Sequence, residues 1–228
     1  MKKTIIATCL ISLFVICVSA SMHFGAFLQD NKMNQEKLAQ RVEKVDENIA
    51  KLVRDEKSKI ERIATPFFKN GAIYKVEKFA PSRPIITFIG CDDKDFTVTL
   101  NANPEGYFDL ATKSGLNLGS KDLRLNYILT FFATTKGAER FQVVEKIDDI
   151  KQRPNLDETN VKKFKEFRDK YAKTIAAPTV SDNTPHRAVI FAVKGQSLIK
   201  IDAVLSPDGK INLQETTLEK ELLIPYSL

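Results

Sequence analysis

The chain has 228 residues, of which 43% are hydrophobic and 28% are charged, and its formal net charge is +6 at pH 7. These fractions are ordinary for globular proteins and exclude a wholly disordered chain. The basic residues are dispersed along the sequence, so the positive charge predicts a solvated surface and no nucleic-acid partner.

The N-terminal segment is apolar from Thr4 to Leu28 and has no Asp, Glu, Lys or Arg between Lys3 and Asp30. Its length is about what a helix needs to cross ~30 Å of hydrocarbon. Val18-Ser19-Ala20 also matches the small-residue site at which a signal peptide is cleaved. We interpret residues 1–28 as a retained signal anchor, with a cleaved signal peptide as the alternative. In both cases the basic N-terminus predicts that the remaining chain is exported.

Residues 29–66 predict one long amphipathic helix of the coiled-coil type, because residues 31–64 contain no Gly or Pro and are rich in helix-forming residues. The apolar positions follow a heptad spacing of four and three, which gives a seam of Leu38, Val42, Val45, Ile49 and Leu52. The β-branched residues at the a positions favour a parallel dimer, in which Arg41 would pair with Asp46 of the other chain. We therefore expect self-association, as a parallel dimer or small oligomer. The alternative is a helix that packs on its own domain.

Residues 67–228 predict an exported domain that mixes strands and helices. The alternation of apolar residues and the turn residues between them predict strands at 72–76, 85–89, 96–100, 123–135, 188–193 and 198–205, with turns at 101–106 and 206–210. Residues 155–176 predict a helix that begins at a capping box of Asn155 and Glu158. Residues 141–150 fit either a helix or a hairpin strand, and the amphipathic tail 218–225 is expected to close the domain. Since strands and helices do not alternate regularly, we expect an α+β fold with a largely antiparallel sheet and at least one packed helix.

Cys91 is the one cysteine outside the apolar segment and could act as a nucleophile with His186 as its base. A reactive cysteine needs a cationic or basic neighbour, whereas Asp92 and Asp93 next to it would raise the pKa of the thiol. We interpret Cys91 as a half-buried residue at the end of a strand.

A metal or cofactor site has little support in the sequence. Asp92, Asp93 and Asp95 are similar to a fragment of a calcium loop, but the central Gly and terminal Glu of an EF-hand are missing. His23 and His186 are the only histidines, and no Gly-rich phosphate loop follows a strand. We therefore expect no catalytic residues, no cofactor and no metal.

The layout predicts a single-pass protein of the bacterial inner membrane that holds a coiled-coil stalk and an α+β interaction domain in the periplasm. By analogy of layout, it is typical of non-enzymatic assembly subunits of membrane complexes, as in secretion, pilus or conjugation machinery. The partners would then be the chain itself and other envelope proteins. The alternative is a soluble periplasmic or secreted protein that binds or neutralises a ligand after cleavage of the leader.

Overall fold

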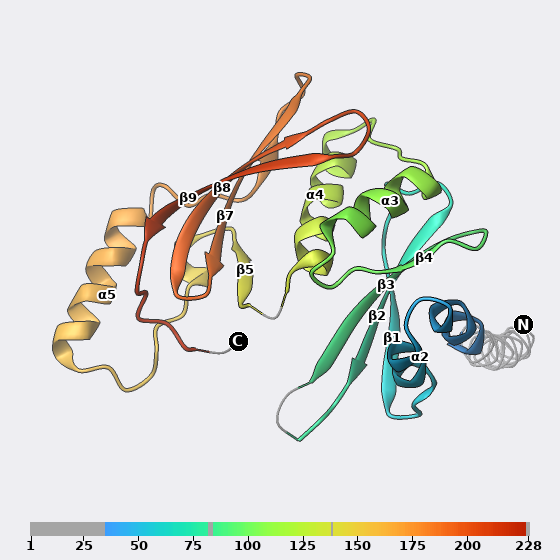
Figure 1. The fold of residues 1–228 in the computed structure, drawn as a ribbon. Coiled ribbons are helices and arrows are strands. Elements are labelled where there is room, and N and C mark those ends of the chain that lie inside the picture. Colours follow the sequence, from blue (N-terminus) through green and yellow to red (C-terminus); the bar gives the residue numbers. More distant parts are fainter. Residues whose placement is uncertain (1–34, 82–83, 138, 227–228) are drawn as a thin grey trace, which may run out of the picture. The chain divides into compact units, whose positions relative to one another are not determined.

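The computed structural model describes residues 35–81, 84–137 and 139–226, and the predicted anchor at residues 1–28 lies outside this part of the chain. The fold is α+β, with two antiparallel sheets and short helices (Figure 1). The described residues divide into two compact units: the first runs up to Ile60 and includes Val76–Ile86, and the second contains Glu61–Lys75 and the residues from Thr87 onward. None of the helices in the described ranges has the length and apolarity that crossing a bilayer requires.

The predicted long helix over residues 31–64 is wrong. Residues 35–43 are helical, a turn follows, α2 spans Glu47–Arg54, and the chain then enters strand β1, Ser58–Ile63. The interruption has a local cause, because the Asp46 carboxylate accepts hydrogen bonds from the main-chain N–H groups of Asn48 (2.8 Å) and Ile49 (3.1 Å). An aspartate that caps a new helix in this way has an extended backbone and ends the previous helix.

The two helical segments of the first unit are joined by polar contacts. The guanidinium of Arg54 in α2 pairs with Glu36 and Glu43 of the preceding segment, and Gln35 donates to the carbonyl of Val53. The residues buried in this region are Leu38, Ala39, Val42, Ala50 and Val53. Val45, by contrast, is 50% exposed, and Ile49 and Leu52 are only half-buried. The heptad seam therefore does not form, since a coiled coil requires one continuous helix.

The first sheet has the order β1-β2-β3-β4, in which β2 spans Gly71–Lys78, β3 Ile85–Asp92 and β4 Thr97–Thr99. The strands predicted at 72–76, 85–89 and 96–100 are confirmed as parts of it. β3 and β4 pair antiparallel, with Gly90 opposite Val98.

Two helices follow where the sequence predicted a turn and a strand. α3 spans Pro104–Ser114 and is capped by Asn103, so the turn predicted at 101–106 is present only at residues 101–102 and its second half is the start of a helix. α4 spans Lys121–Thr135, capped by Ser120, so the strand predicted at 123–135 is wrong. The β-branched and aromatic content suggested a strand, but Tyr127, Ile128 and Phe131 are buried at helical spacing. Packing on one face of a helix here outweighs the intrinsic strand preference of the residues.

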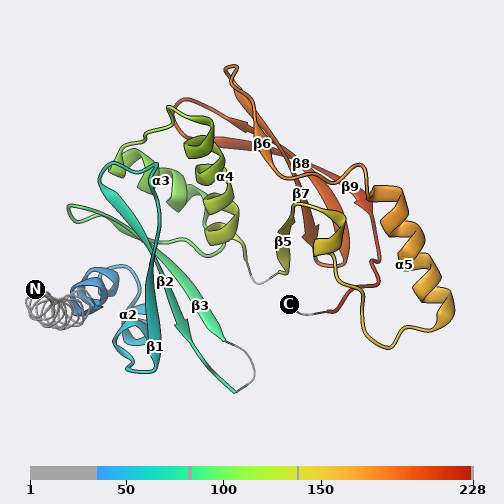
Figure 2. The same ribbon diagram turned by 180° about the vertical axis from the view of Figure 1, so that it is seen from behind.

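The second sheet has the order β5-β7-β8-β9, and the two-residue strand β6 pairs with β7 on the side of β5 (Figure 2). Its strands are β5 Phe141–Val144, β6 Thr179–Val180, β7 His186–Lys194, β8 Ser197–Leu205 and β9 Ile211–Glu219. The strands predicted at 188–193 and 198–205 are confirmed, and the ambiguous segment 141–150 forms β5 and the short 3-10 helix η1, Ile147–Asp149. The predicted turn at 206–210 is present, with the Gly209 N–H donating to the Ser206 carbonyl.

Each face of the second sheet is covered by its own core, because side chains alternate between the two faces along a strand. Ala188, Ile190 and Ala192 of β7 belong to the larger core, which contains Tyr107 and Tyr127 of α3 and α4. Phe191 and Val193 face the opposite way, into a smaller core with α5, Glu158–Tyr171. The predicted helix over 155–176 is therefore present but shorter, and it is capped by Asp157 and not by Asn155.

Candidate functional site

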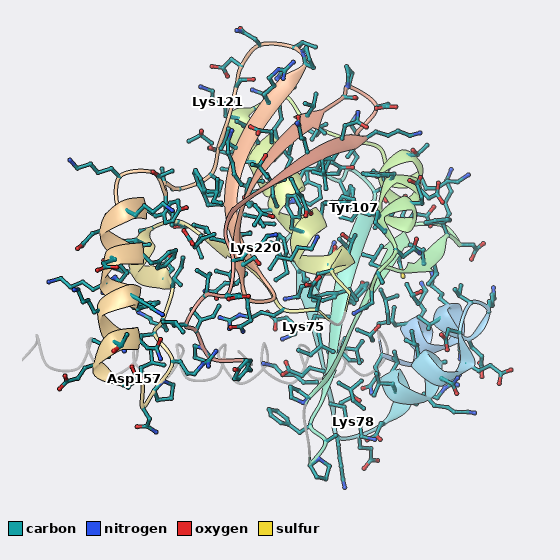
Figure 3. The ribbon with its side chains drawn as sticks, turned by 60° about the vertical axis from the view of Figure 1, so that its left-hand side comes forward. Lys75, Lys78, Tyr107, Lys121, Asp157 and Lys220 are labelled. Carbon is teal, nitrogen blue, oxygen red and sulfur yellow. The ribbon has the colours of Figure 1, made fainter. Side chains whose placement is uncertain are left out.

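A cleft of about 770 Å³ lies between α5 and the last residues of the chain, which leave β9 and run back over the smaller core. One wall is formed by α5 residues, and the other by residues 219–223 with Tyr226. Figure 3 labels Asp157, the cap of α5, and Lys220, which lines the second wall. Both walls belong to the second compact unit.

The apolar floor of the cleft is formed by Phe164 and Phe167 of α5, which pack with Tyr171 in the smaller core. Phe164, Phe167 and Tyr171 recur every three or four residues, so they lie on one face of the helix. All three are buried, and successive ring centroids are 5.7 and 5.4 Å apart. Leu222 from the opposite wall packs in the same core and also lines the cleft.

Polar contacts connect α5 to the end of β9. The Tyr171 hydroxyl donates to the carbonyl of Leu218 (2.7 Å) and to the carboxylate of Glu219 (3.1 Å). Lys170 Nζ lies 2.8 Å from Glu219 Oε2. The hydrogen bond from Lys170 lowers the pKa of the Glu219 carboxyl, and the hydrogen bond to Glu219 raises the pKa of Lys170. Both groups are thus charged over a wide pH range, and the pair holds the two walls together.

The tail beyond β9 is held by side chains that bind its main-chain carbonyls. Arg153 donates through its main-chain N–H to Leu223 (2.8 Å) and through Nε to Ile224 (3.1 Å). Arg140 and Gln196 both donate to the carbonyl of Pro225. Leu222 and Ile224 are buried in the smaller core, so the expectation that the tail closes the domain is confirmed.

The rim of the cleft combines an exposed aromatic residue with charges of both signs. Tyr226 is 74% exposed, and the Arg153 guanidinium lies 4.0 Å from the centroid of its ring. Lys163 and Lys220 contribute positive charge, and Glu166 and Glu221 contribute negative charge. An apolar centre surrounded by a polar rim with Tyr and Arg is typical of surfaces that bind proteins.

The residues that the sequence singled out lie elsewhere. Cys91 is buried on β3 in the first sheet, 3.7 Å from the Thr97 hydroxyl, whereas His186 begins β7 in the second sheet with Nδ1 3.2 Å from the carbonyl of Ser181. The Asp92 carboxylate accepts hydrogen bonds from the main-chain N–H groups of Lys94 and Phe96, as a turn residue does. No group of three His, Cys, Asp or Glu side chains in the described ranges is placed to hold a metal ion.

The predicted self-association residues belong to the first compact unit, whereas the residues that line the cleft belong to the second. Asp46, predicted to pair with Arg41 of a second chain, is the N-cap of α2. Sequence reasoning found the apolar stripe of α5 but missed the cleft, because its second wall comes from a tail about fifty residues further along the chain. The available signal was the amphipathic pattern of residues 218–225.

No family model, no curated protein sequence and no solved structure matches this chain.

Proposed function

We propose that this chain is an exported, non-enzymatic protein-binding subunit whose cleft between α5 and the C-terminal tail receives part of a protein partner in the bacterial envelope. The observation that carries the proposal is the composition of the cleft. It joins an apolar floor of Phe164 and Phe167 to a rim that holds Tyr226, Arg153 and charges of both signs. Such a rim suits a polypeptide, which presents apolar, charged and amide groups together.

The lining of the cleft also favours binding over catalysis. The described residues that line it include no Ser, Cys, His or Asp side chain. Nucleophilic catalysis by a serine or cysteine needs a base such as His beside the hydroxyl or thiol, and the described residues of the lining supply neither partner. Lys170 and Glu219 are in contact with each other, so each already neutralises the other. The Lys170–Glu219 pair therefore stabilises the walls of the cleft.

Export is supported by the sequence of the leader, which is basic at Lys2 and Lys3 and apolar from Thr4 to Leu28. We propose that the domain acts on the periplasmic side of the inner membrane. The coiled-coil stalk is not part of this proposal, because the helix that it required is interrupted at Asp46.

Site-specific photo-crosslinking in the native host tests the proposal. A photoreactive phenylalanine analogue replaces Tyr226 on the cleft rim, and the matched control replaces Phe79, which is 79% exposed in the first unit. We expect the same envelope protein to be crosslinked repeatedly from position 226 and not from position 79. Equal crosslinking from both positions, or none from position 226, would contradict the proposal.

A further inference from the structure

The outer edge of β9 is a long, open strand edge. β9 is the last strand in the order of the second sheet and pairs only with β8 among the described strands. It is nine residues long, whereas the other sheet edges are β1 with six residues, β5 with four, β4 with three and β6 with two. In a strand paired on one side, alternate residues direct their N–H and C=O groups outward.

The usual means of protecting such an edge are missing along most of β9. Residues 212–217 are exposed, so neither face of the strand is covered there. This stretch has no proline and one charged residue, Glu215, whose carboxylate lies 2.8 Å from Lys194 Nζ. The edge strand β1 differs, because it carries Lys59, Glu61 and Arg62 within six residues. Charged side chains on an edge discourage pairing with other chains, and β9 largely lacks them.

The register irregularity of β9 is confined to its end. Leu198 is opposite Glu219 but Ile199 is opposite Thr217, so Leu218 is an extra residue. Its carbonyl accepts the hydrogen bond from Tyr171 described above. The strand from Ile211 to Thr217 is therefore regular, and the irregular end leads directly into the cleft, whose wall begins at Glu219.

We infer that the partner binds by adding an extended segment to the outer edge of β9, with the end of that segment entering the cleft; this inference rests on the proposed function. An extended main chain is the chemical group that satisfies a row of alternating donors and acceptors. Lys210 and Lys220 are exposed at the two ends of β9, and neither has a carboxylate partner among the described residues. The segment therefore has a neutral middle flanked by acidic residues.

The first test selects ligands for the full-length chain in detergent micelles from a phage-displayed library of random linear 16-residue peptides. Thr216→Lys places a charge on the edge, and Thr112→Lys makes the same change on the exposed surface of α3 as the matched control. We expect Thr216→Lys to weaken binding of the selected peptides at least about tenfold, while Thr112→Lys leaves it unchanged. Failure to select any peptide, or equal binding by both variants, would overturn the inference.

The second test separates main-chain pairing from side-chain contacts. The best peptide is synthesised with N-methyl groups at alternate residues, once in each phase. Strand addition predicts that one phase loses binding and the other retains it, because only every second N–H of the added strand faces β9. Equal affinity for the two phases contradicts strand addition.

The outcomes also distinguish this inference from the proposed function. Binding that is lost in Tyr226→Ala but unaffected by Thr216→Lys would leave the cleft as a binding site and refute strand addition. A full-length wild-type dimer that becomes monomeric in Thr216→Lys would identify a second copy of the chain as the occupant and refute the external partner.

Discussion

Lys170 of α5 and Glu219 of β9 form an ion pair, with 2.8 Å between Nζ and Oε2, and both side chains line the cleft. The pair connects residues 49 positions apart in the sequence. It also brings together the helix and the strand end that form the two walls.

The pair predicts a pH dependence of stability. The pKa of the Glu219 carboxyl is lowered in the folded protein from its ordinary value of 4.5. The carboxylate therefore contributes to the stability of the folded protein above pH 4.5, and this contribution is lost as the pH falls through the lowered pKa. We expect wild type to be more stable than Glu219→Gln at neutral pH, with the difference vanishing in acid. Denaturant unfolding of both proteins across this range measures it. A difference that stays constant with pH would show that the carboxylate charge contributes nothing.

The apolar floor predicts a large effect on stability. Phe167→Ala removes a buried ring from the smaller core and is expected to lower the free energy of unfolding by about 3–5 kcal/mol. Val161→Ala on the same helix is the control, because Val161 is 42% exposed and its loss should change stability by no more than about 0.5 kcal/mol. Similar losses in chemical denaturation for the two variants would contradict the packing of α5 on the sheet.

Gly209 is predicted to be intolerant of any side chain. Its φ is +88°, and an added Cβ would lie 2.4 Å from Leu116 Cδ1 and 3.0 Å from the Tyr127 hydroxyl oxygen. Gly209→Ala should therefore destabilise the protein by about 2–4 kcal/mol through backbone strain and overpacking. Gly119→Ala, whose Cβ would have only the Asn117 side chain at 3.5 Å, should be neutral or stabilising by up to about 1 kcal/mol. Thermal unfolding of the two variants distinguishes these results.

The buried tyrosines predict instability in alkali. Tyr107 donates to the Tyr127 carbonyl (2.8 Å), Tyr127 donates to the Gly209 carbonyl (2.7 Å), and burial raises the pKa of both hydroxyls. Because the unfolded chain ionises near pH 10 and the folded chain does not, stability falls as the pH rises above 10. Of the five tyrosines, these two should ionise only as the domain unfolds. An alkaline titration followed by tyrosinate absorbance and by circular dichroism measures this. Ionisation of all five tyrosines while the circular dichroism is unchanged would contradict the prediction.

Asp46 distinguishes an interrupted helix from a continuous one. In the middle of a continuous helix, Asp46→Ala would raise stability, since Ala is the better helix former. Because Asp46 caps α2, we expect Asp46→Ala instead to lower the free energy of unfolding by about 0.5–2 kcal/mol. Lys44→Ala in the adjacent exposed turn serves as the control. Hydrogen exchange of the α2 amides measures the effect, and slower exchange in Asp46→Ala would contradict the interrupted helix.

Local patterns predicted the strands of clean alternation correctly, but the strand predicted at 123–135 and the long helix predicted at 31–64 were wrong. Alternating segments such as 198–205 form strands because period-two patterning matches a sheet whose two faces are covered by different residues. In α4, the residue types resemble those of a strand, and only the spacing of Tyr127, Ile128 and Phe131 indicates a helix. Asp46 carries the same ambiguity, because the e position of a heptad and a helix cap both accept an aspartate.

Local sequence patterns could not predict the cleft, for a different reason. Phe164 and Phe167 could be predicted to be buried, but not which segment packs beside them. That choice depends on long-range contacts, such as those of Arg153 with the carbonyl of Ile224 and of Tyr171 with that of Leu218. These contacts form only once the second sheet is complete.

The most direct test of the cleft as the binding site uses the envelope protein identified by crosslinking from position 226. This partner is purified without the crosslink, and its affinity is measured for the full-length wild-type chain and two variants. Tyr226→Ala removes the exposed aromatic residue of the cleft rim, and Phe79→Ala removes an equally exposed one outside it. By isothermal titration calorimetry we expect Tyr226→Ala to raise the Kd at least about tenfold and Phe79→Ala to leave it unchanged. An unchanged Kd for Tyr226→Ala would contradict the assignment of the cleft as the binding site.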